Sequence, residues 1–138
     1  MLPVLILLIC AGITGAVRES HAGGDLTWAR SLPDALREAK QAGVPVMVSV
    51  HSPDCGWCNK LDSETLTDPD VLALSRQFVC VRLDSDVDPD AVLKYHVTAF
   101  PATIFLAPSG RDVARIPGFV PAREFIAGMR DALKLARR

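Results

Sequence analysis

The chain has 138 residues, a length typical of one domain, and 49% of them are hydrophobic, which is enough for a buried core. Its formal net charge of −1 provides neither the basic surface that nucleic acids require nor an acidic field for a cationic partner. Only 6% of the residues are aromatic, so a surface on which nucleic-acid bases stack is also not expected.

The N-terminal stretch differs in kind from the rest of the chain. Residues 2–17 carry no charge and are mostly Leu, Ile, Val, Ala and Gly, the pattern of the apolar core of a secretory signal. The alternative is an uncleaved membrane anchor, but this run is at or below the short end of the roughly 17–25 residues that span a bilayer. We expect residues 1–22 to be a signal peptide and residues 23–138 to be one domain, exported to the periplasm or another extracytoplasmic site.

The first structural elements are expected soon after this signal. Residues 26–28 are a candidate short strand. Ser31 is a typical N-cap, and a helix that starts there would end at Gly43. The run 44–51 is short, rich in valine and bounded by glycine and proline, which predicts a buried strand.

Cys55 and Cys58 follow that strand directly, and the spacing of apolar residues predicts a helix from the cysteines to about Thr65. A cysteine at a helix N-terminus faces unpaired backbone N–H groups and the positive end of the helix dipole. Both favour the thiolate, which is the nucleophilic form. Cys58 lies one turn further on, where it can attack a mixed disulfide formed at Cys55. The arrangement therefore predicts a site of dithiol–disulfide exchange.

Two other roles for this cysteine pair are less favoured. Half of a zinc site would need a second Cys-x-x-Cys or His-x-x-His pair, and the sequence has none. A structural disulfide across two residues closes a tiny loop and constrains the unfolded chain little. We expect no resident metal ion and no cofactor.

The second half of the chain predicts further alternation of helices and strands. Asp68 and Asp88 each precede a proline and predict helix starts, the second helix reaching residue 95. Strands are predicted over 78–84, over 97–106 with a proline near its start, and over 112–116. A C-terminal helix is predicted over 121–136, with a buried stripe of Phe125, Ile126, Met129, Leu133 and Ala136. Cys80 lies inside a strand, with no helix N-terminus to activate it, and is expected to be a small buried hydrophobic residue rather than a reactive thiol.

This order of elements resembles the thioredoxin-like family from about Leu26 to the C-terminus. Three motifs carry the resemblance. The first is the cysteine motif Cys55–Gly56–Trp57–Cys58. The second, Phe100–Pro101–Ala102–Thr103, is similar to the family's cis-proline loop, and the third, Ile116–Pro117–Gly118–Phe119, is similar to its glycine turn before the last helix. The segment 39–46 is similar to a pattern of the exported branch of the family. The resemblance implies a thioredoxin fold, which is an α/β fold with a central mixed sheet flanked by helices.

The resemblance also implies roles for individual residues. Cys55 would be the attacking thiolate and Cys58 the resolving thiol. The peptide bond before Pro101 would be cis, and Phe100 and Pro101 would help to form the substrate groove. Trp57 stands where thioredoxin itself has proline, and it either contributes to a docking surface or packs on its own loop.

The sequence departs from the family pattern at two positions of the strand before the cysteines. The family often keeps a buried carboxylate six residues before the first cysteine, as a proton acceptor for the second, and this chain has Ser49 there. A hydroxyl cannot act as a general base near neutral pH. His51 replaces a usual aromatic residue, and a protonated His51 near Cys55 would lower the pKa of that thiol. A histidine that only packs at the strand end is an equally good interpretation.

Together these features predict an exported thiol–disulfide oxidoreductase that acts on protein thiols and disulfides. No basic residue lies between the cysteines to stabilise a thiolate, which favours a reductase or isomerase over a strong oxidant. We expect a monomer with an unidentified redox partner, for which a membrane protein is one candidate. Two alternatives remain: a non-catalytic thioredoxin-like chaperone or adaptor that holds clients beside Pro101, and a carrier of a soft metal ion that uses Cys55, Cys58 and His51.

Overall fold

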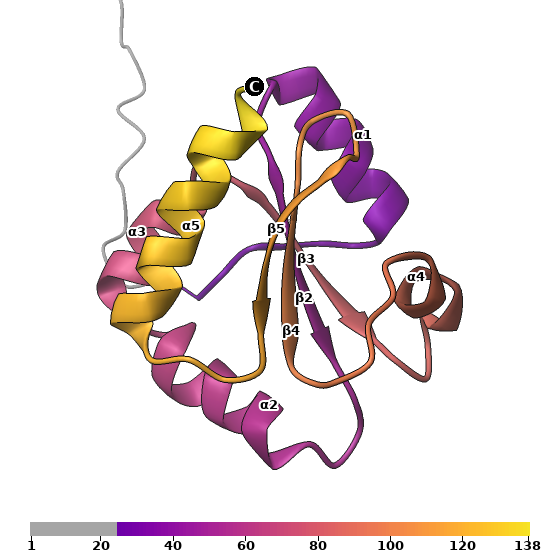
Figure 1. Cartoon of the computed structure of the whole chain (residues 1–138), viewed down its shortest axis with the longest axis vertical. Helices are drawn as coiled ribbons and strands as arrows, with labels where there is room; N and C mark the ends of the chain where they lie inside the picture. The colour runs from indigo at the N-terminus through magenta and orange to yellow at the C-terminus, as the bar shows by residue number, and fades with distance from the viewer. Residues whose placement is uncertain (1–24) are drawn as a thin grey trace, which may run out of the picture.

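A computed structural model describes residues 25–138, so the expected signal peptide and the candidate anchor at residues 2–17 lie outside the described residues. Figure 1 shows a central twisted sheet with helices on both faces. The strands are β1 (Trp28–Ala29), β2 (Val46–His51), β3 (Val79–Asp84), β4 (Ala102–Leu106) and β5 (Asp112–Pro117). The helices are α1 (Leu32–Ala42), α2 (Gly56–Lys60), the π-helix η1 (Leu61–Thr65), α3 (Pro69–Ser75), α4 (Pro89–Lys94) and α5 (Ala122–Ala136).

The five strands form one mixed sheet in the order β1-β3-β2-β4-β5. β1 and β2 both pair with β3 in parallel, whereas β4 pairs antiparallel with β2 and with β5. β2 is the central strand and is almost entirely buried, as its valine-rich sequence predicts. The expected α/β class, with a mixed sheet flanked by helices, is confirmed.

Alternation along β2 divides the core into two clusters. Val46, Val48 and Val50 belong to the cluster that packs against α1. Met47 belongs to the other cluster, which contains Phe125 of α5. Because successive side chains of a strand point to opposite faces, Ser49 and His51 lie on the same face of the sheet as Met47.

Two of the three N-caps predicted at Ser31, Asp68 and Asp88 form side-chain hydrogen bonds to their helices. The Ser31 hydroxyl accepts a hydrogen bond from the Asp34 N–H, and Asp68 accepts from the N–H groups of the first turn of α3. Gly43 ends α1 with a φ of 67°, the left-handed conformation that glycine adopts without a steric penalty. Asp88 differs from the prediction, because its carboxylate accepts from the Asp84 N–H instead of capping α4.

Three element boundaries also differ from the predictions. The expected strand over 97–106 begins only at Ala102. The residues before it first close the end of α4, where the Val97 N–H donates to the Val92 carbonyl oxygen, and then connect α4 to the sheet. The helix from the cysteines to Thr65 exists, but its second half is the π-helix η1. In α5, Ala132 is fully buried although the predicted stripe omitted it, and the predicted Ile126, Leu133 and Ala136 are only partly buried.

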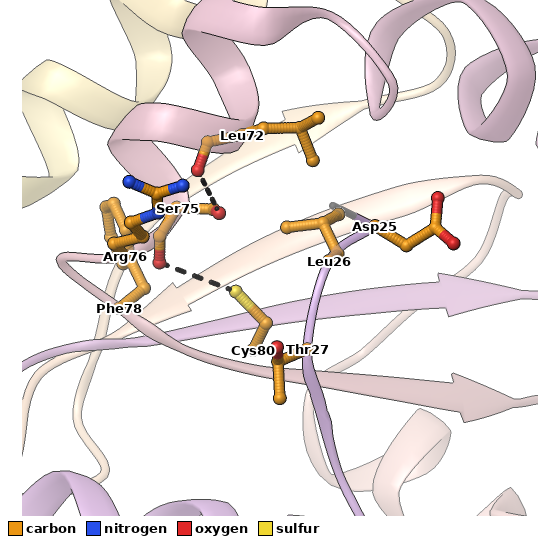
Figure 2. Close-up of a pocket in the computed structure, with 8 residues that line it drawn as sticks. All are labelled: Asp25, Leu26, Thr27, Leu72, Ser75, Arg76, Phe78 and Cys80. Carbon is orange, nitrogen blue, oxygen red and sulfur yellow. Dashed lines mark hydrogen bonds between the residues drawn. The ribbon is translucent and has the colours of Figure 1, made fainter. Parts of the chain in front are cut away.

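Cys80 lies in the core beside a cavity of about 380 Å³, which Figure 2 shows. Its Sγ atom points to the Ser75 carbonyl oxygen at 3.8 Å, and the residue is 4% exposed. Burial raises the pKa of the Cys80 thiol to about 12, so the group is protonated at neutral pH. The predicted burial of Cys80 is confirmed. Within residues 25–138, no helix is both long and apolar enough to cross a membrane.

Candidate active site

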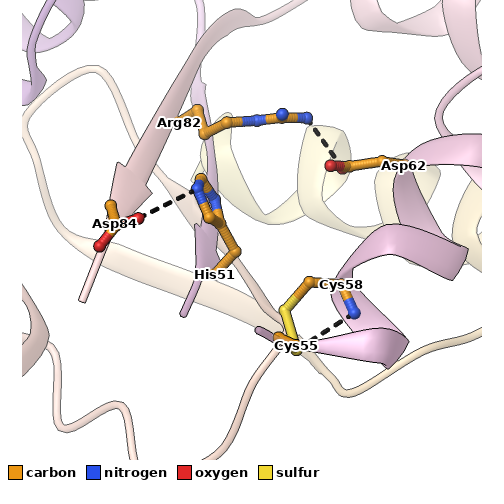
Figure 3. Close-up of a disulfide and its surroundings, with 6 residues drawn as sticks. All are labelled: His51, Cys55, Cys58, Asp62, Arg82 and Asp84. Carbon is orange, nitrogen blue, oxygen red and sulfur yellow. Dashed lines mark hydrogen bonds and ion pairs between the residues drawn. A yellow bond between two sulfur atoms is a disulfide. The ribbon is translucent and has the colours of Figure 1, made fainter. Parts of the chain in front are cut away.

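The two cysteines stand where β2 ends and α2 begins, and they form a disulfide (Figure 3). Cys55 is the N-cap residue of α2 and is partly exposed. Cys58 lies one turn further along and is 4% exposed. Solvent and a partner protein can therefore reach the first sulfur more easily than the second.

The backbone around the disulfide supplies a hydrogen bond to the exposed sulfur. The Cys58 N–H donates to Cys55 Sγ at 3.2 Å. Such a donor stabilises a thiolate more than a neutral thiol, because the charged form is the better acceptor. After reduction, this geometry favours negative charge on Cys55.

The cis-proline loop lies beside the end of β2. The Phe100–Pro101 peptide bond is cis, as the resemblance implies, and Pro101 is buried. The Gly118 N–H donates to the Pro101 carbonyl oxygen at 2.8 Å, which joins the glycine turn to this loop. Gly118 has a φ of 68°, which a residue with a Cβ rarely adopts. The Phe100 ring packs against the α1 side of the core, so much of it faces inward.

Trp57 is a large hydrophobic side chain exposed beside the disulfide, with 60% of its surface accessible. Its ring packs against Phe119, with the ring centroids 5.8 Å apart. Lys60 Nζ lies 5.3 Å from the centre of the Trp57 ring and 4.8 Å from that of Phe119. Sequence reasoning missed both neighbours, although Lys60 is one helical turn from Trp57 and Phe119 belongs to the glycine-turn motif.

Ser49 and His51 lie on the face of the sheet that α2 and η1 cover. Ser49 is 3% exposed, and its neighbours in register are Arg82 on β3 and Thr103 on β4. The Nε2 atom of His51 lies 3.6 Å from a carboxylate oxygen of Asp84. The Nδ1 atom of His51 is buried and has no hydrogen-bond partner among the described residues, and the same is true of Thr103 Oγ1.

A second charged pair ties η1 to the sheet. Arg82 donates to a carboxylate oxygen of Asp62 at 2.8 Å, and its guanidinium lies 4.6 Å from the centre of the Trp28 ring. Figure 3 shows this pair and the His51–Asp84 pair on the same side of the disulfide. Neither pair can be predicted from local sequence patterns, because each joins residues far apart in the chain.

The soft-metal alternative needs a cluster of ligands around the disulfide. In the part of the chain that the structure describes, no group of three or more His, Cys, Asp or Glu side chains is placed to hold a metal ion. His51, the expected third ligand, turns its Nε2 atom toward Asp84.

Comparisons with known proteins agree with this geometry. A family model described as a thioredoxin-like domain matches residues 32–133. The chain is 33% identical over 109 residues to the Thiol:disulfide interchange protein DsbD of Ralstonia nicotianae, an alignment that covers 75% of this chain and 18% of that protein. The chain thus spans less than a fifth of the length of this curated relative.

Solved structures give the same fold. A thioredoxin from Thermus thermophilus superposes with a TM-score of 0.70 at 31% identity, covering 78% of this chain and 86% of that one. A DsbH oxidoreductase superposes with a TM-score of 0.74 at 23% identity, covering 83% of this chain and 88% of that one, a likeness of fold alone. The fold predicted from the sequence is therefore confirmed.

Proposed function

Because the chain belongs to the thioredoxin-like domain family, we propose that it is a thiol–disulfide oxidoreductase that exchanges disulfides with protein substrates. One observation carries the proposal: a disulfide at the start of α2 joins the partly exposed Cys55 to the buried Cys58. A disulfide that only stabilised the fold would gain little from so short a loop. One accessible and one shielded sulfur instead suit the two steps of an exchange reaction.

In the first step, the Cys55 thiolate attacks a sulfur of the substrate disulfide. A mixed disulfide forms, and the other substrate sulfur leaves as a thiolate. In the second step, Cys58 attacks Cys55 Sγ, closes the intramolecular disulfide and releases the reduced substrate. The hydrogen bond from the Cys58 N–H to Cys55 Sγ stabilises a thiolate on Cys55, which supports Cys55 as the attacking residue.

The surface around Cys55 supports a docking role for Trp57 and for the cis-proline loop. Trp57 is exposed beside the disulfide, and its contact with Phe119 holds the ring against the glycine turn. Pro101 lies on the neighbouring loop, joined to the same turn through Gly118. We assign substrate contact to Trp57, Pro101 and the exposed part of Phe100.

The direction that we propose is reduction or isomerisation of substrate disulfides. Gly56 and Trp57 bring no positive charge between the cysteines, and the nearest lysine, Lys60, has its ammonium group against two aromatic rings. Proteins with a redox-active cysteine pair of this kind span roughly 150 mV in reduction potential, so the direction is decided by a measurement of that potential.

The proposed setting is outside the cytoplasm. Residues 1–22 would act as a signal peptide and residues 23–138 as the exported domain, with an uncleaved anchor at residues 2–17 as the alternative. The curated relative is named a thiol:disulfide interchange protein, which supports disulfide-bonded proteins as substrates and a redox partner that resets the cysteine pair.

A trapping experiment tests this function. Cys58→Ser, mixed with a protein disulfide such as insulin, should accumulate a mixed disulfide through Cys55 that mass spectrometry detects. The matched Cys55→Ser variant should accumulate none. If neither variant traps substrate, and Cys55→Ser binds clients as tightly as the unaltered chain, the protein is an adaptor instead.

A further inference from the structure

Two buried polar atoms lie on the sheet face beneath the disulfide, and no group among the described residues satisfies them: His51 Nδ1 and Thr103 Oγ1. Buried polar side chains are almost always hydrogen-bonded, so two such atoms on one face require an explanation. Both lie close to Ser49, which stands where members of the family that the chain resembles often keep a buried carboxylate. Thr103 pairs in register with Ser49, and His51 is two residues further along β2.

We propose that the imidazole of His51, positioned by Asp84, accepts the proton of Cys58 in place of a carboxylate at position 49, with the Thr103 hydroxyl as a positioning residue for the transfer. The inference rests on the proposed function, because it assigns a proton acceptor to the second step of that exchange. Ser49 cannot fill the role, since a hydroxyl is not a base near neutral pH.

The packing places Cys58 over this face. Cys58, Leu61 and Thr65 are the buried residues of α2 and η1, and Leu61 packs in the same core cluster as Met47. Alternation puts Ser49 and His51 on the Met47 side of β2. Likewise, Thr103 shares a face of β4 with Phe105, which belongs to that cluster.

The contacts of His51 leave one nitrogen free for the reaction. Its Nε2 atom faces the Asp84 carboxylate at 3.6 Å, and this nearby negative charge favours a neutral imidazole with its proton on that nitrogen. Nδ1 then carries a lone pair and can accept a proton. Figure 3 shows the ring turned toward Asp84, with the disulfide beyond the other side of His51 in that view. A proton reaches Nδ1 through a water molecule, which the Thr103 hydroxyl can hold because it both donates and accepts.

The other ionisable groups around His51 are already engaged or point elsewhere. Arg82 has no lone pair and is bound to Asp62, while Asp84 also accepts from the Asp86 N–H. Asp88 accepts from the Asp84 N–H, and β4 contributes no ionisable side chain. His96 and Arg115 line a pocket of about 120 Å³ together with Thr103, so His96 is the rival proton acceptor.

The S–H bond of Cys58 breaks, its proton passes to Nδ1 of His51, and the imidazolium is balanced by Asp84. The Cys58 sulfur attacks Cys55 Sγ, so an S–S bond forms within the protein while the bond between Cys55 and the substrate sulfur breaks. The substrate sulfur leaves as a thiolate and takes up a proton. Over both steps, the dithiol of the protein gives two electrons to the substrate disulfide.

The test is the pH dependence of the second step in the full chain, with oxidised glutathione as the probe. Rapid quenching and mass spectrometry give the rates at which the mixed disulfide forms and resolves. In His51→Gln, resolution should slow at least tenfold at pH 7, because general base catalysis contributes about 10²–10⁴-fold. Its rate should then rise with pH in proportion to the thiolate fraction of Cys58. Formation of the mixed disulfide, measured in the Cys58→Ser background, should stay within twofold.

Three further variants separate proton transfer from a structural effect. Thr103→Val should slow resolution several-fold, and His96→Asn, the matched control, should leave it unchanged. Ser49→Asp in the His51→Gln background should restore part of the rate, and a thermal melt shows whether it folds. Resolution within twofold of the unaltered chain for His51→Gln across pH 6–9, or loss caused by His96→Asn instead, overturns the inference. If Cys58→Ser, which cannot resolve the intermediate, forms no mixed disulfide with glutathione, the proposed function fails and the inference with it.

Discussion

At the scale of single residues, Trp57 separates the sulfur chemistry from substrate docking. We expect Trp57→Ala to lower kcat/KM for insulin reduction about five- to tenfold, because its exposed ring is removed from the docking surface. Exchange with oxidised glutathione, which needs no such surface, should change less than twofold. Leu93→Ala, which removes an apolar side chain of α4 that is even more exposed than Trp57, is the control. Equal losses with both substrates would instead place Trp57 in the chemistry of the cysteines.

Cys80 gives a prediction about stability and pH. Burial raises the pKa of its thiol from 9.0 to about 12. The folded pKa is the higher one, so the unfolded chain loses this proton first as the pH rises. The resulting stabilisation is intact below pH 9 and is lost between about pH 9 and 12. Urea unfolding of the unaltered chain and of Cys80→Ala should give a difference in unfolding free energy that falls above pH 9. A difference that stays constant to pH 11 would contradict the burial argument.

At the scale of elements, α5 meets β5 at a glycine. A Cβ atom on Gly128 would lie 2.6 Å from the Ile116 Cδ1 atom. Alanine in a helix gains about 0.8–1.0 kcal/mol over glycine, but overpacking a core costs roughly 1–3 kcal/mol. We expect Gly128→Ala to destabilise the protein by about 1 kcal/mol in urea unfolding. In an Ile116→Val background, which lacks that Cδ1 atom but keeps the γ-carbon that lies 3.0 Å from the Cβ position, the same change should cost less. Destabilisation of equal size in both backgrounds would rule out the contact as the cause.

The boundaries of some helices could be predicted from the sequence alone, and those of other elements could not. Ser31, Gly43 and Asp68 act within one helical turn, so their local chemistry predicted the ends of α1 and the start of α3. The π-turn of η1 and the late start of β4 depend on how the chain packs, and no local pattern encodes them.

Some features of the candidate site could likewise be predicted from the sequence, and others could not. The spacing of Cys55 and Cys58 predicted the disulfide, and the resemblance predicted the cis bond at Pro101. The contact of His51 with Asp84 depends on the pairing of β2 with β3, so it could be found only from the structure.

At the scale of the whole molecule, the direction of electron flow is linked to stability. The cysteine pair has one reduction potential in the folded chain and another in the unfolded chain. The gap between the two potentials measures how much more stable the folded chain is with the disulfide than with the dithiol. Roughly every 30 mV corresponds to 1.4 kcal/mol of unfolding free energy. A strong oxidant of this kind has a stabilised reduced form. If the protein is a reductase, the disulfide form should instead be the more stable one, by about 2 kcal/mol for a potential roughly 40 mV below that of the unfolded pair.

Urea unfolding of the full chain, with and without a thiol reductant, measures this difference. The variant with both Cys55→Ala and Cys58→Ala, treated in the same way, shows whether the reductant itself affects stability. Equilibration of the pair against a thiol buffer should give a matching potential, because both experiments close one thermodynamic cycle. A dithiol form that is the more stable by about 2 kcal/mol would mean that the protein is a disulfide donor or an isomerase, and the search for a partner would then turn to oxidants.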